Sequence, residues 1–236
     1  MDVYLYSARS YDRASFAHAA EGTALRFTYL EDRLTPTTAT LARGAAAVCL
    51  FVNDDAGAES LEQLAAVGVR HVALRSAGFN HVDLLAAQRL GLSVVRVPAY
   101  SPNAVAEHTI ALILALNRRI HRAYNRVRDR NFSLEGLVGF DLRGKVAGVV
   151  GTGQIGALVA RLLWHFRCRV LAVDPVPDEG LRELGVTYAD HEQLWRESDI
   201  ISLNAPLTPE TRHLVRTETV AQMKAGVMIV NTGRGP

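Results

Sequence analysis

Three glycines, Gly151, Gly153 and Gly156, separate a short apolar run from a segment with leucines at helical spacing. A G-x-G-x-x-G pattern alone is weak, but here a strand predicted at Val146–Val150 runs directly into it and a helix is expected after it. In that setting the glycines allow a tight turn, close approach of the backbone to a pyrophosphate, and close packing of helix on strand. The N–H groups and dipole at the helix start stabilise the phosphate charge. The motif therefore favours a dinucleotide site over a plain turn.

An acidic residue ends the next predicted strand. Asp174 follows Val170–Val173 and lies 18 residues beyond Gly156. A carboxylate at this point accepts hydrogen bonds from a ribose 2′-hydroxyl and repels a 2′-phosphate. The residue therefore favours NAD over NADP as the cofactor, and the alternative is a solvated acid at a strand end.

The elements that must position these residues are short strands alternating with helices along the whole chain. In the first hundred residues strands are predicted at Val3–Tyr6, Phe27–Leu30, Val48–Val52, Val72–Leu74 and Val94–Val97. The alternation resumes after Gly144, with strands at Val146–Val150, Val170–Val173, Val186–Tyr188, Ile200–Leu203 and Val227–Val230. Strands this continuously apolar indicate parallel sheets with helices on both faces. The predicted fold class is α/β with two domains.

One long helix is expected from about residue 104 to about residue 130, after the helix-start signal Ser101-Pro102-Asn103. Its first half is apolar all round, which predicts burial between layers. Its second half carries six arginines between Arg118 and Arg130. A nucleic-acid surface is one interpretation of those arginines, but a solvated or subunit-facing surface is favoured because the whole chain is nearly balanced in charge. The domain boundary is placed near residue 100.

Composition excludes several classes of protein. Apolar residues make up 49% and charged residues 21% of the 236, as in an ordinary globular chain, and the net charge of +2 does not suggest a nucleic-acid or membrane-surface binder. The two cysteines, Cys49 and Cys168, form no C-x-x-C pair, so no disulfide framework or zinc site is expected and a cytoplasmic location is favoured. No secretory signal is visible. The longest apolar run, Ile110–Leu116, is far short of the ~20 residues that a membrane span needs.

Five segments resemble the D-isomer-specific 2-hydroxyacid dehydrogenases and occur in that family's order along the chain. They are Arg75–Asp83, Val97–His108, Gly151–Gly156, Ser198–Thr208 and Met228–Gly235. Two further stretches, Leu116–Tyr124 and Asn131–Gly136, resemble the fermentative D-lactate dehydrogenase branch. The resemblance implies an NAD-dependent oxidoreductase that interconverts small 2-oxo acids and D-2-hydroxy acids by hydride transfer, with pyruvate and D-lactate as the expected pair.

The resemblance also implies an architecture and an assembly. Residues 1–100 would form a flavodoxin-like substrate domain. Residues 101–236 would form a Rossmann NAD-binding domain, joined through the long helix 104–130 and lacking its C-terminal part. The family commonly associates, so a homo-oligomer, dimer or tetramer, is expected of the full-length protein.

Reduction of a 2-oxo acid needs an anchor for the carboxylate, a group that polarises the carbonyl, a proton donor and a positioned nicotinamide. The turn Ser76-Ala77-Gly78 follows a predicted strand, and its small residues leave N–H groups free for a carboxylate. The resemblance assigns this turn, Tyr100 and Phe51 to the substrate site, although Phe51 fits a core position equally well. It assigns the catalytic arginine to Arg234, whose guanidinium can form a fixed fork to a carboxylate and its neighbouring carbonyl.

Further contacts to NAD follow from the resemblance alone. Besides the three glycines and Asp174, they are Gln154, Ile155, Ala205, Pro206, Thr211 and Thr232. Two positions depart from the pattern: Asn204 stands where lactate-branch relatives often have histidine, and Thr211 replaces the usual asparagine.

The family's proton donor is a histidine, oriented by a glutamate, that lies well beyond the catalytic arginine. All eight histidines of this chain precede Arg234, and none fits that role. We therefore expect a fragment of a longer enzyme, in which residues 1–236 alone lack measurable pyruvate reduction. Two alternatives stay open: an NAD-sensing, corepressor-like binding protein, and the same chemistry on another 2-hydroxy acid.

Overall fold

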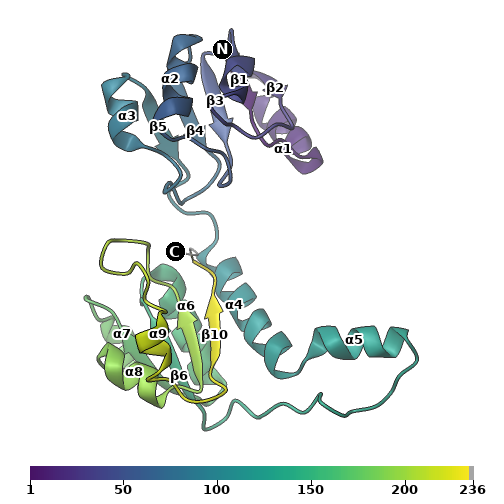
Figure 1. Ribbon diagram of the computed structural model, residues 1–236, viewed down its shortest axis with the longest axis vertical. Coiled ribbons are helices and arrows are strands. Elements are labelled where there is room, and N and C mark those ends of the chain that lie inside the picture. Colours follow the sequence, from purple (N-terminus) through teal and green to yellow (C-terminus); the bar gives the residue numbers. More distant parts are fainter. Residues whose placement is uncertain (234–236) are drawn as a thin grey trace. The chain divides into compact units, whose positions relative to one another are not determined.

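The structure is a computed structural model that describes residues 1–233. The chain folds into two compact units, Met1–Tyr100 and a second unit that begins at Ser101 (Figure 1). Each unit has its own hydrophobic core around a parallel sheet. All ten predicted strands are present, with ends shifted by at most two residues, and the α/β class is confirmed.

The first unit is a five-stranded sheet in the order β2-β1-β3-β4-β5, parallel throughout. Its elements are β1 (Asp2–Leu5), α1 (Ser10–Ala20), β2 (Arg26–Tyr29), the 3-10 helix η1 (Thr38–Ala42), β3 (Ala47–Leu50), α2 (Ala58–Ala66), β4 (His71–Leu74), α3 (Leu84–Arg89) and β5 (Ser93–Arg96). The chain moves outward to β2 and then returns to the other side of β1, so the strand order reverses between β1 and β3. Ligands of such sheets bind at the carboxyl ends of the strands beside this reversal.

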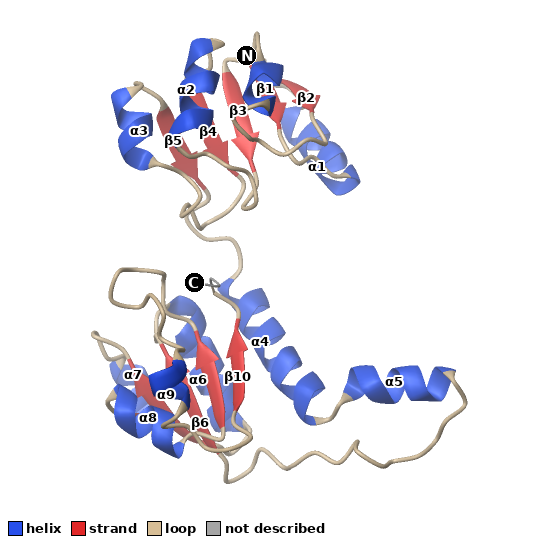
Figure 2. Ribbon diagram, in the orientation of Figure 1, coloured by secondary structure: helices blue, strands red, loops and turns tan. Residues whose placement is uncertain are grey.

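Alternate residues of β3 serve the two faces of this sheet, as strand geometry requires. Val48 and Leu50 belong to a core with α2 and η1, whereas Ala47 and Cys49 face a smaller cluster that includes Phe16 of α1. Figure 2 shows α2 and α3 on one side of the strands and α1 on the other. The sheet is thus covered on both faces, and its strand ends are left for function.

The second unit has a parallel five-stranded sheet in the order β10-β9-β6-β7-β8. Its elements are α4 (Pro102–Asn117), α5 (Ile120–Arg128), β6 (Val146–Val150), α6 (Gln154–His165), β7 (Arg169–Val173), α7 (Glu179–Leu184), β8 (Thr187–Tyr188), α8 (His191–Glu197), β9 (Ile200–Leu203), α9 (Thr217–Val220) and β10 (Met228–Asn231). The strand order reverses between β6 and β9. The glycine turn Gly151–Gly156 directly follows β6, so it lies beside this reversal. The main core packs α4 and α6 against one face, and a smaller cluster that includes α8 covers the other.

The prediction of a single helix over residues 104–130 is wrong. The structure has two helices, α4 and α5, and Arg119 between them adopts a left-handed conformation with φ +51°. The side chain of Asn117 is buried; its amide donates to the Phe140 carbonyl (2.8 Å) and its carbonyl accepts from the Phe140 N–H (2.9 Å). Those bonds hold the end of α4 to the loop before β6, while α5 buries no residue.

Within residues 1–233 no helix is long and apolar enough to cross a bilayer. The same residues contain no cluster of three or more histidine, cysteine or acidic side chains arranged to hold a metal ion.

Candidate active site

In the glycine turn of the second unit, two of the three glycines have backbone atoms so near that a Cβ would collide with them. Gly151 has φ +86°, and a Cβ there would lie 2.7 Å from the amide nitrogen of Ala205. A Cβ on Gly156 would lie 1.8 Å from the carbonyl oxygen of Gly151. Neither position can hold a larger residue unless the backbone moves. The turn thereby brings Ala205, two residues after β9, against the start of α6.

Gly153 differs, because the space above it is open. A Cβ on this residue would meet no heavy atom of the described chain within 4 Å. It is the N-cap of α6, and no side chain of the described residues caps the helix. The first N–H groups of α6, including those of Gln154 and Ile155, are therefore left for an anion.

Asp174 is fixed directly after β7. One carboxylate oxygen accepts from the Thr152 N–H (2.6 Å), and the other accepts from the Val176 N–H (2.8 Å). The Tyr188 hydroxyl donates to the Thr152 hydroxyl (3.0 Å), which holds the turn from the side of β8. A carboxylate has about four acceptor positions, so two backbone bonds leave Asp174 able to accept from ribose hydroxyls.

These residues fit a dinucleotide in three respects: an uncapped helix start, open space above Gly153, and an anchored carboxylate one strand away. A bound dinucleotide would place its pyrophosphate at the start of α6 and a ribose at Asp174.

The other residues assigned to the cofactor fall into two groups. Ala205 and Pro206 follow β9 beside the turn, and the Thr211 hydroxyl accepts from the Thr208 N–H (2.7 Å) and bonds the Pro206 carbonyl, which closes their loop on itself. Thr232 lies after β10, where its hydroxyl bonds that of buried Thr109 on α4 (2.9 Å). The structure thus brings Ala205 to the glycines and gives Thr211 and Thr232 structural bonds of their own.

Asn204, one of the two departures from the family pattern, lies between β9 and Ala205. Its amide nitrogen donates to the carbonyl and hydroxyl oxygens of Ser202 (3.2 and 3.0 Å). Its Oδ1 is buried and accepts no hydrogen bond from the described residues. An imidazole at this position would lack that amide donor.

The turn Ser76–Gly78, predicted to bind the substrate and called the substrate turn below, lies at the carboxyl end of β4. Ser76 Oγ donates to the Gly78 carbonyl (2.8 Å), and the Arg96 guanidinium donates to the Ala77 carbonyl (3.0 Å). Within residues 1–233 the N–H groups of Ala77 and Gly78 form no hydrogen bond. Two adjacent amides are therefore available to one carboxylate.

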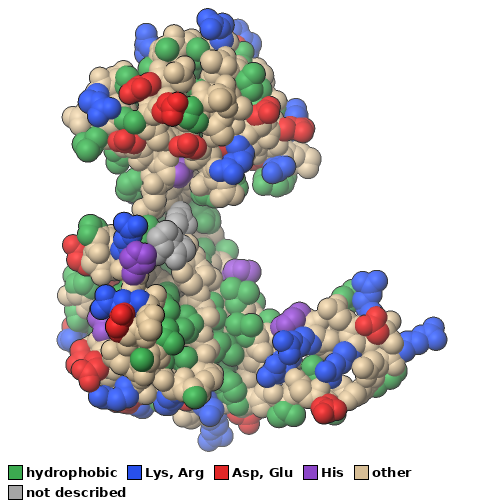
Figure 3. Space-filling model, in the orientation of Figure 1, with side chains coloured by type: hydrophobic (Ala, Val, Ile, Leu, Met, Phe, Trp, Pro, Cys, Tyr) green, Lys and Arg blue, Asp and Glu red, His purple; other side chains and the backbone are tan. Residues whose placement is uncertain are grey.

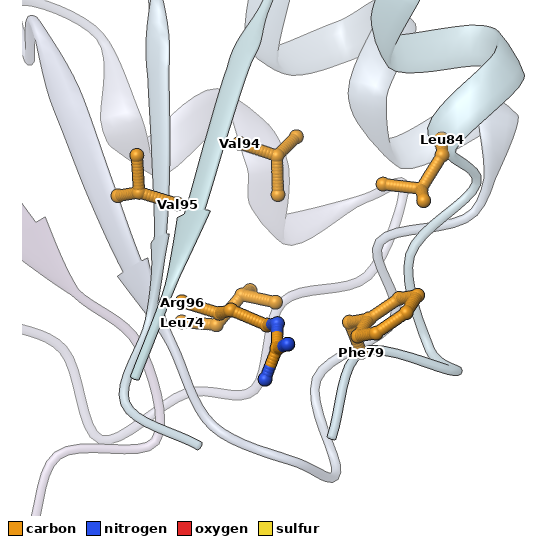
Figure 4. A pocket seen from close by; sticks show the side chains of 6 residues that line it. All are labelled: Leu74, Phe79, Leu84, Val94, Val95 and Arg96. Carbon is orange, nitrogen blue, oxygen red and sulfur yellow. The ribbon is translucent and has the colours of Figure 1, made fainter. Parts of the chain in front are cut away.

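A small cavity of about 170 Å³ adjoins this turn, and it is lined by Leu74, Phe79, Leu84, Val94, Val95 and Arg96. Figure 4 shows the Arg96 side chain beside Leu74 and below Val94 and Val95, extending toward the side on which the Phe79 ring lies. The Arg96 guanidinium lies 5.4 Å from the centre of that ring. Because the same guanidinium holds the Ala77 carbonyl, the cavity wall and the turn are tied together.

Phe51 and Tyr100 have different surroundings. Phe51 is half-buried just after β3, where its N–H donates to Asp54 (2.6 Å) and its ring lies under the Arg75 guanidinium at 5.0 Å. Tyr100 is 70% exposed at the end of the first unit. Arg234, the predicted catalytic arginine, lies outside the described residues.

Two titratable groups near these strand ends, Cys49 and Tyr6, have raised pKa values. Burial raises the pKa of the Cys49 thiol, although the nearby Arg75 opposes that shift. Burial also raises the pKa of the Tyr6 phenol, which donates to the Thr38 carbonyl (2.9 Å). Both groups stay protonated at neutral pH, which suits core positions rather than acid–base catalysis.

Comparison with known proteins decides the family. The model of the D-isomer specific 2-hydroxyacid dehydrogenase NAD binding domain matches residues 110–236. The chain is 54% identical over 235 residues to the D-lactate dehydrogenase of Escherichia coli (strain K12), which covers 100% of this chain and 71% of that protein. The chain belongs to the D-isomer-specific 2-hydroxyacid dehydrogenases.

Solved structures agree with this membership. The apo-structure of the Escherichia coli D-lactate dehydrogenase superposes with a TM-score of 0.92 at 54% identity, over 100% of this chain and 74% of that one. A D-lactate dehydrogenase from Aquifex aeolicus, complexed with NAD and lactic acid, gives 0.85 at 35% identity over 99% and 69%. This dehydrogenase is therefore an NAD-dependent oxidoreductase that interconverts 2-oxo acids and D-2-hydroxy acids, and the predictions of family, activity and cofactor are confirmed.

The dehydrogenase's first unit contains three residues that sequence reasoning missed. Asp54 and Arg96 hold the Phe51 N–H and the Ala77 carbonyl through the bonds described above, and Arg75 donates to the Tyr6 carbonyl just after β1. Arg75 opens one of the motifs that carry the resemblance, so its position was visible but its contacts were not. No pattern in the sequence singled out Asp54 or Arg96.

Proposed function

We propose that this protein reduces pyruvate to D-lactate with NADH. The observation that carries the proposal is the pair of free N–H groups at Ala77 and Gly78, on a turn suited to one small carboxylate. The 54% identity to a D-lactate dehydrogenase over the whole chain supports pyruvate as the substrate that carries this carboxylate.

In the proposed reaction the pyruvate carboxylate accepts hydrogen bonds from the Ala77 and Gly78 amides. Phe51 and Tyr100 are assigned to the substrate site by the resemblance. Arg234 bonds the carboxylate and the C2 carbonyl oxygen, so that it stabilises the negative charge that develops on that oxygen as hydride reaches C2. The proton that completes the hydroxyl is assigned, by resemblance, to a histidine downstream of Arg234.

The cofactor assignments are proposals of the same kind. The pyrophosphate lies at Gly151, Gly153 and the start of α6, and Asp174 accepts from the adenosine ribose. The Asp174 charge would repel a 2′-phosphate, so NADH is expected to be preferred to NADPH.

We also propose that the protein assembles as a homo-oligomer, a dimer in the first instance. Ile120, Tyr124 and Val127 occur at helical spacing on α5 and are 55%, 60% and 57% exposed. An apolar stripe with this exposure marks an interaction surface. Basic side chains gather over the same helix in Figure 3, which leaves the stripe bordered by charge.

The two cysteines are buried and unpaired, which supports a cytoplasmic location.

The test uses the protein as its complete gene encodes it. NADH oxidation is measured with pyruvate, glyoxylate, hydroxypyruvate and branched 2-oxo acids, and the lactate formed is assayed for its stereochemistry. The highest kcat/KM is expected with pyruvate, and the product is expected to be D-lactate. Preference for another 2-oxo acid would contradict the substrate, and NADH binding without any turnover would favour an NAD-sensing protein.

A variant tests the role of Arg234. Arg234→Gln is expected to lower kcat/KM for pyruvate by roughly 10²–10³-fold, the usual loss on removing one group that stabilises an oxyanion. The dissociation constant for NADH should not change. Arg212→Gln, which removes an exposed arginine, serves as the matched control.

A further inference from the structure

Arg75 is the residue directly before the substrate turn, yet its side chain is directed into the first unit and is only 12% exposed. Its Nη1 donates to the carbonyls of Tyr6 (3.0 Å) and Cys49 (3.4 Å), and its Nη2 donates to the Ser7 carbonyl (2.9 Å). Its Nε lies 3.5 Å from an Asp12 carboxylate oxygen. These carbonyls stand at or just after the ends of β1 and β3, so one guanidinium joins the carboxyl ends of three strands.

The same guanidinium holds a residue of the candidate substrate site. Its carbon lies 5.0 Å from the centre of the Phe51 ring, a stacking distance at which a cation attracts an aromatic face. The backbone of Phe51 is fixed separately, since its N–H donates to Asp54, which is 1% exposed. Asp54 also accepts from Ser7 Oγ (2.7 Å) and the Leu34 N–H (2.9 Å). Phe51 is thus held at its ring by Arg75 and at its backbone by a buried carboxylate.

An arginine suits this arrangement for a geometric reason. The planar guanidinium offers several donors in a fixed fork and a flat face for stacking, whereas a lysine ammonium offers a single point of charge. Because its donors go to protein carbonyls and to Asp12, Arg75 acts on a substrate through the groups it holds.

We propose that Arg75 is a positioning residue of the substrate site, which fixes the Phe51 ring and the adjoining Ser76–Gly78 turn in the geometry that binds a 2-oxo acid. This inference rests on the proposed function, because it takes Phe51 and the turn to be substrate contacts. It assigns Arg75 a role in substrate affinity and none in cofactor binding.

The experiment is a double-mutant cycle on the complete enzyme with Arg75→Met, Phe51→Leu and the double variant. Each protein is characterised by kcat, the KM for pyruvate, the NADH dissociation constant and the melting temperature. The matched control is Arg13→Met, which removes another arginine stacked on an aromatic ring, Tyr29 (5.0 Å), from an exposed position on α1.

Arg75→Met is expected to raise the KM for pyruvate about tenfold, the scale of one lost cation–π contact together with a displaced ring. The kcat and the NADH dissociation constant should change less than about twofold, since binding common to ground and transition states is lost. The KM of the double variant should be at most about twice the higher of the two single-variant KM values, because both changes remove the same ordered ring. Arg13→Met should leave all three constants unchanged.

Two results would overturn the proposal: a wild-type KM in an Arg75→Met protein with a lowered melting temperature, which shows a structural role only, or effects that multiply in the double variant. If Arg75→Met does not fold, Arg75→Lys takes its place, and the same rise in KM at constant NADH affinity is required of it. A wild-type enzyme without 2-oxo acid turnover would overturn the proposed function as well, whereas an active wild type with an unaltered variant contradicts the Arg75 role alone.

Discussion

At the scale of single residues, Gly153 and Gly156 lie in one turn but would accept a methyl group very differently. A Cβ on Gly153 enters open space at φ −62°, whereas a Cβ on Gly156 meets the Gly151 carbonyl oxygen at 1.8 Å. Gly156→Ala is therefore expected to lower the free energy of unfolding by about 1–3 kcal/mol, the usual cost of overpacking. Gly153→Ala should change it by less than about 0.5 kcal/mol, because reduced freedom of the unfolded chain offsets a poorer cap.

The two variants should separate stability from cofactor binding. The Gly153 methyl group would occupy the space that the pyrophosphate needs, so Gly153→Ala should raise the NADH dissociation constant by about 10–100-fold through lost charge-assisted hydrogen bonds. Urea denaturation and fluorescence titration with NADH measure the two effects. Wild-type NADH affinity in Gly153→Ala would show that the pyrophosphate does not lie over this residue.

The site residues that the sequence predicted and those that it missed differ in how local their signals are. The glycine turn follows β6 and Asp174 follows β7, which is the next strand in the chain and the neighbour of β6 in the sheet, so their closeness in sequence reflects their closeness in the fold. Arg75 depends on carbonyls that lie 69 and 26 residues away in the chain, at Tyr6 and Cys49. No local pattern encodes such contacts, because they arise only when β1, β3 and β4 become neighbours.

At the scale of elements, the break between α4 and α5 can be tested through Arg119. A non-glycine residue at φ +51° carries a steric cost that glycine avoids. Arg119→Gly is therefore expected to be more stable than Arg119→Ala by about 1 kcal/mol. At Arg122, inside α5, the order should be reversed by about 1 kcal/mol, because glycine is the poorer helix former.

Urea denaturation of the four variants checks both signs in one experiment. If alanine were the more stable residue at position 119 as well, the residue would be helical, and the continuous helix predicted from sequence would be the correct description. Sequence patterns suggested continuity because no glycine or proline stands between Pro102 and Arg130. The signal for the break was the buried amide of Asn117, whose partner Phe140 lies 23 residues downstream.

At the scale of the whole molecule, the exposed stripe of α5 is the feature that the fold leaves unexplained. Ile120, Tyr124 and Val127 are all more than half exposed, and in the described chain α5 buries no residue against the sheet. A helix this amphipathic gains stability only by burying its apolar face. Pairing with the same stripe of a second copy would meet that need, as expected for a self-complementary two-fold interface.

In the proposed oligomer, Val127→Glu is expected to separate the copies into monomers, because burying a carboxylate at an apolar interface costs several kcal/mol. Asn125→Glu adds the same charge on the polar side of α5 and should leave the assembly intact, so it controls for net charge. Light scattering during size-exclusion chromatography of the complete protein gives the mass of each variant. A wild-type monomer, or equal dissociation of both variants, would show that the stripe is not the contact between copies. Because α5 lies outside the sheet whose strand ends carry the proposed cofactor residues, the NADH dissociation constant of Val127→Glu should equal that of the wild type.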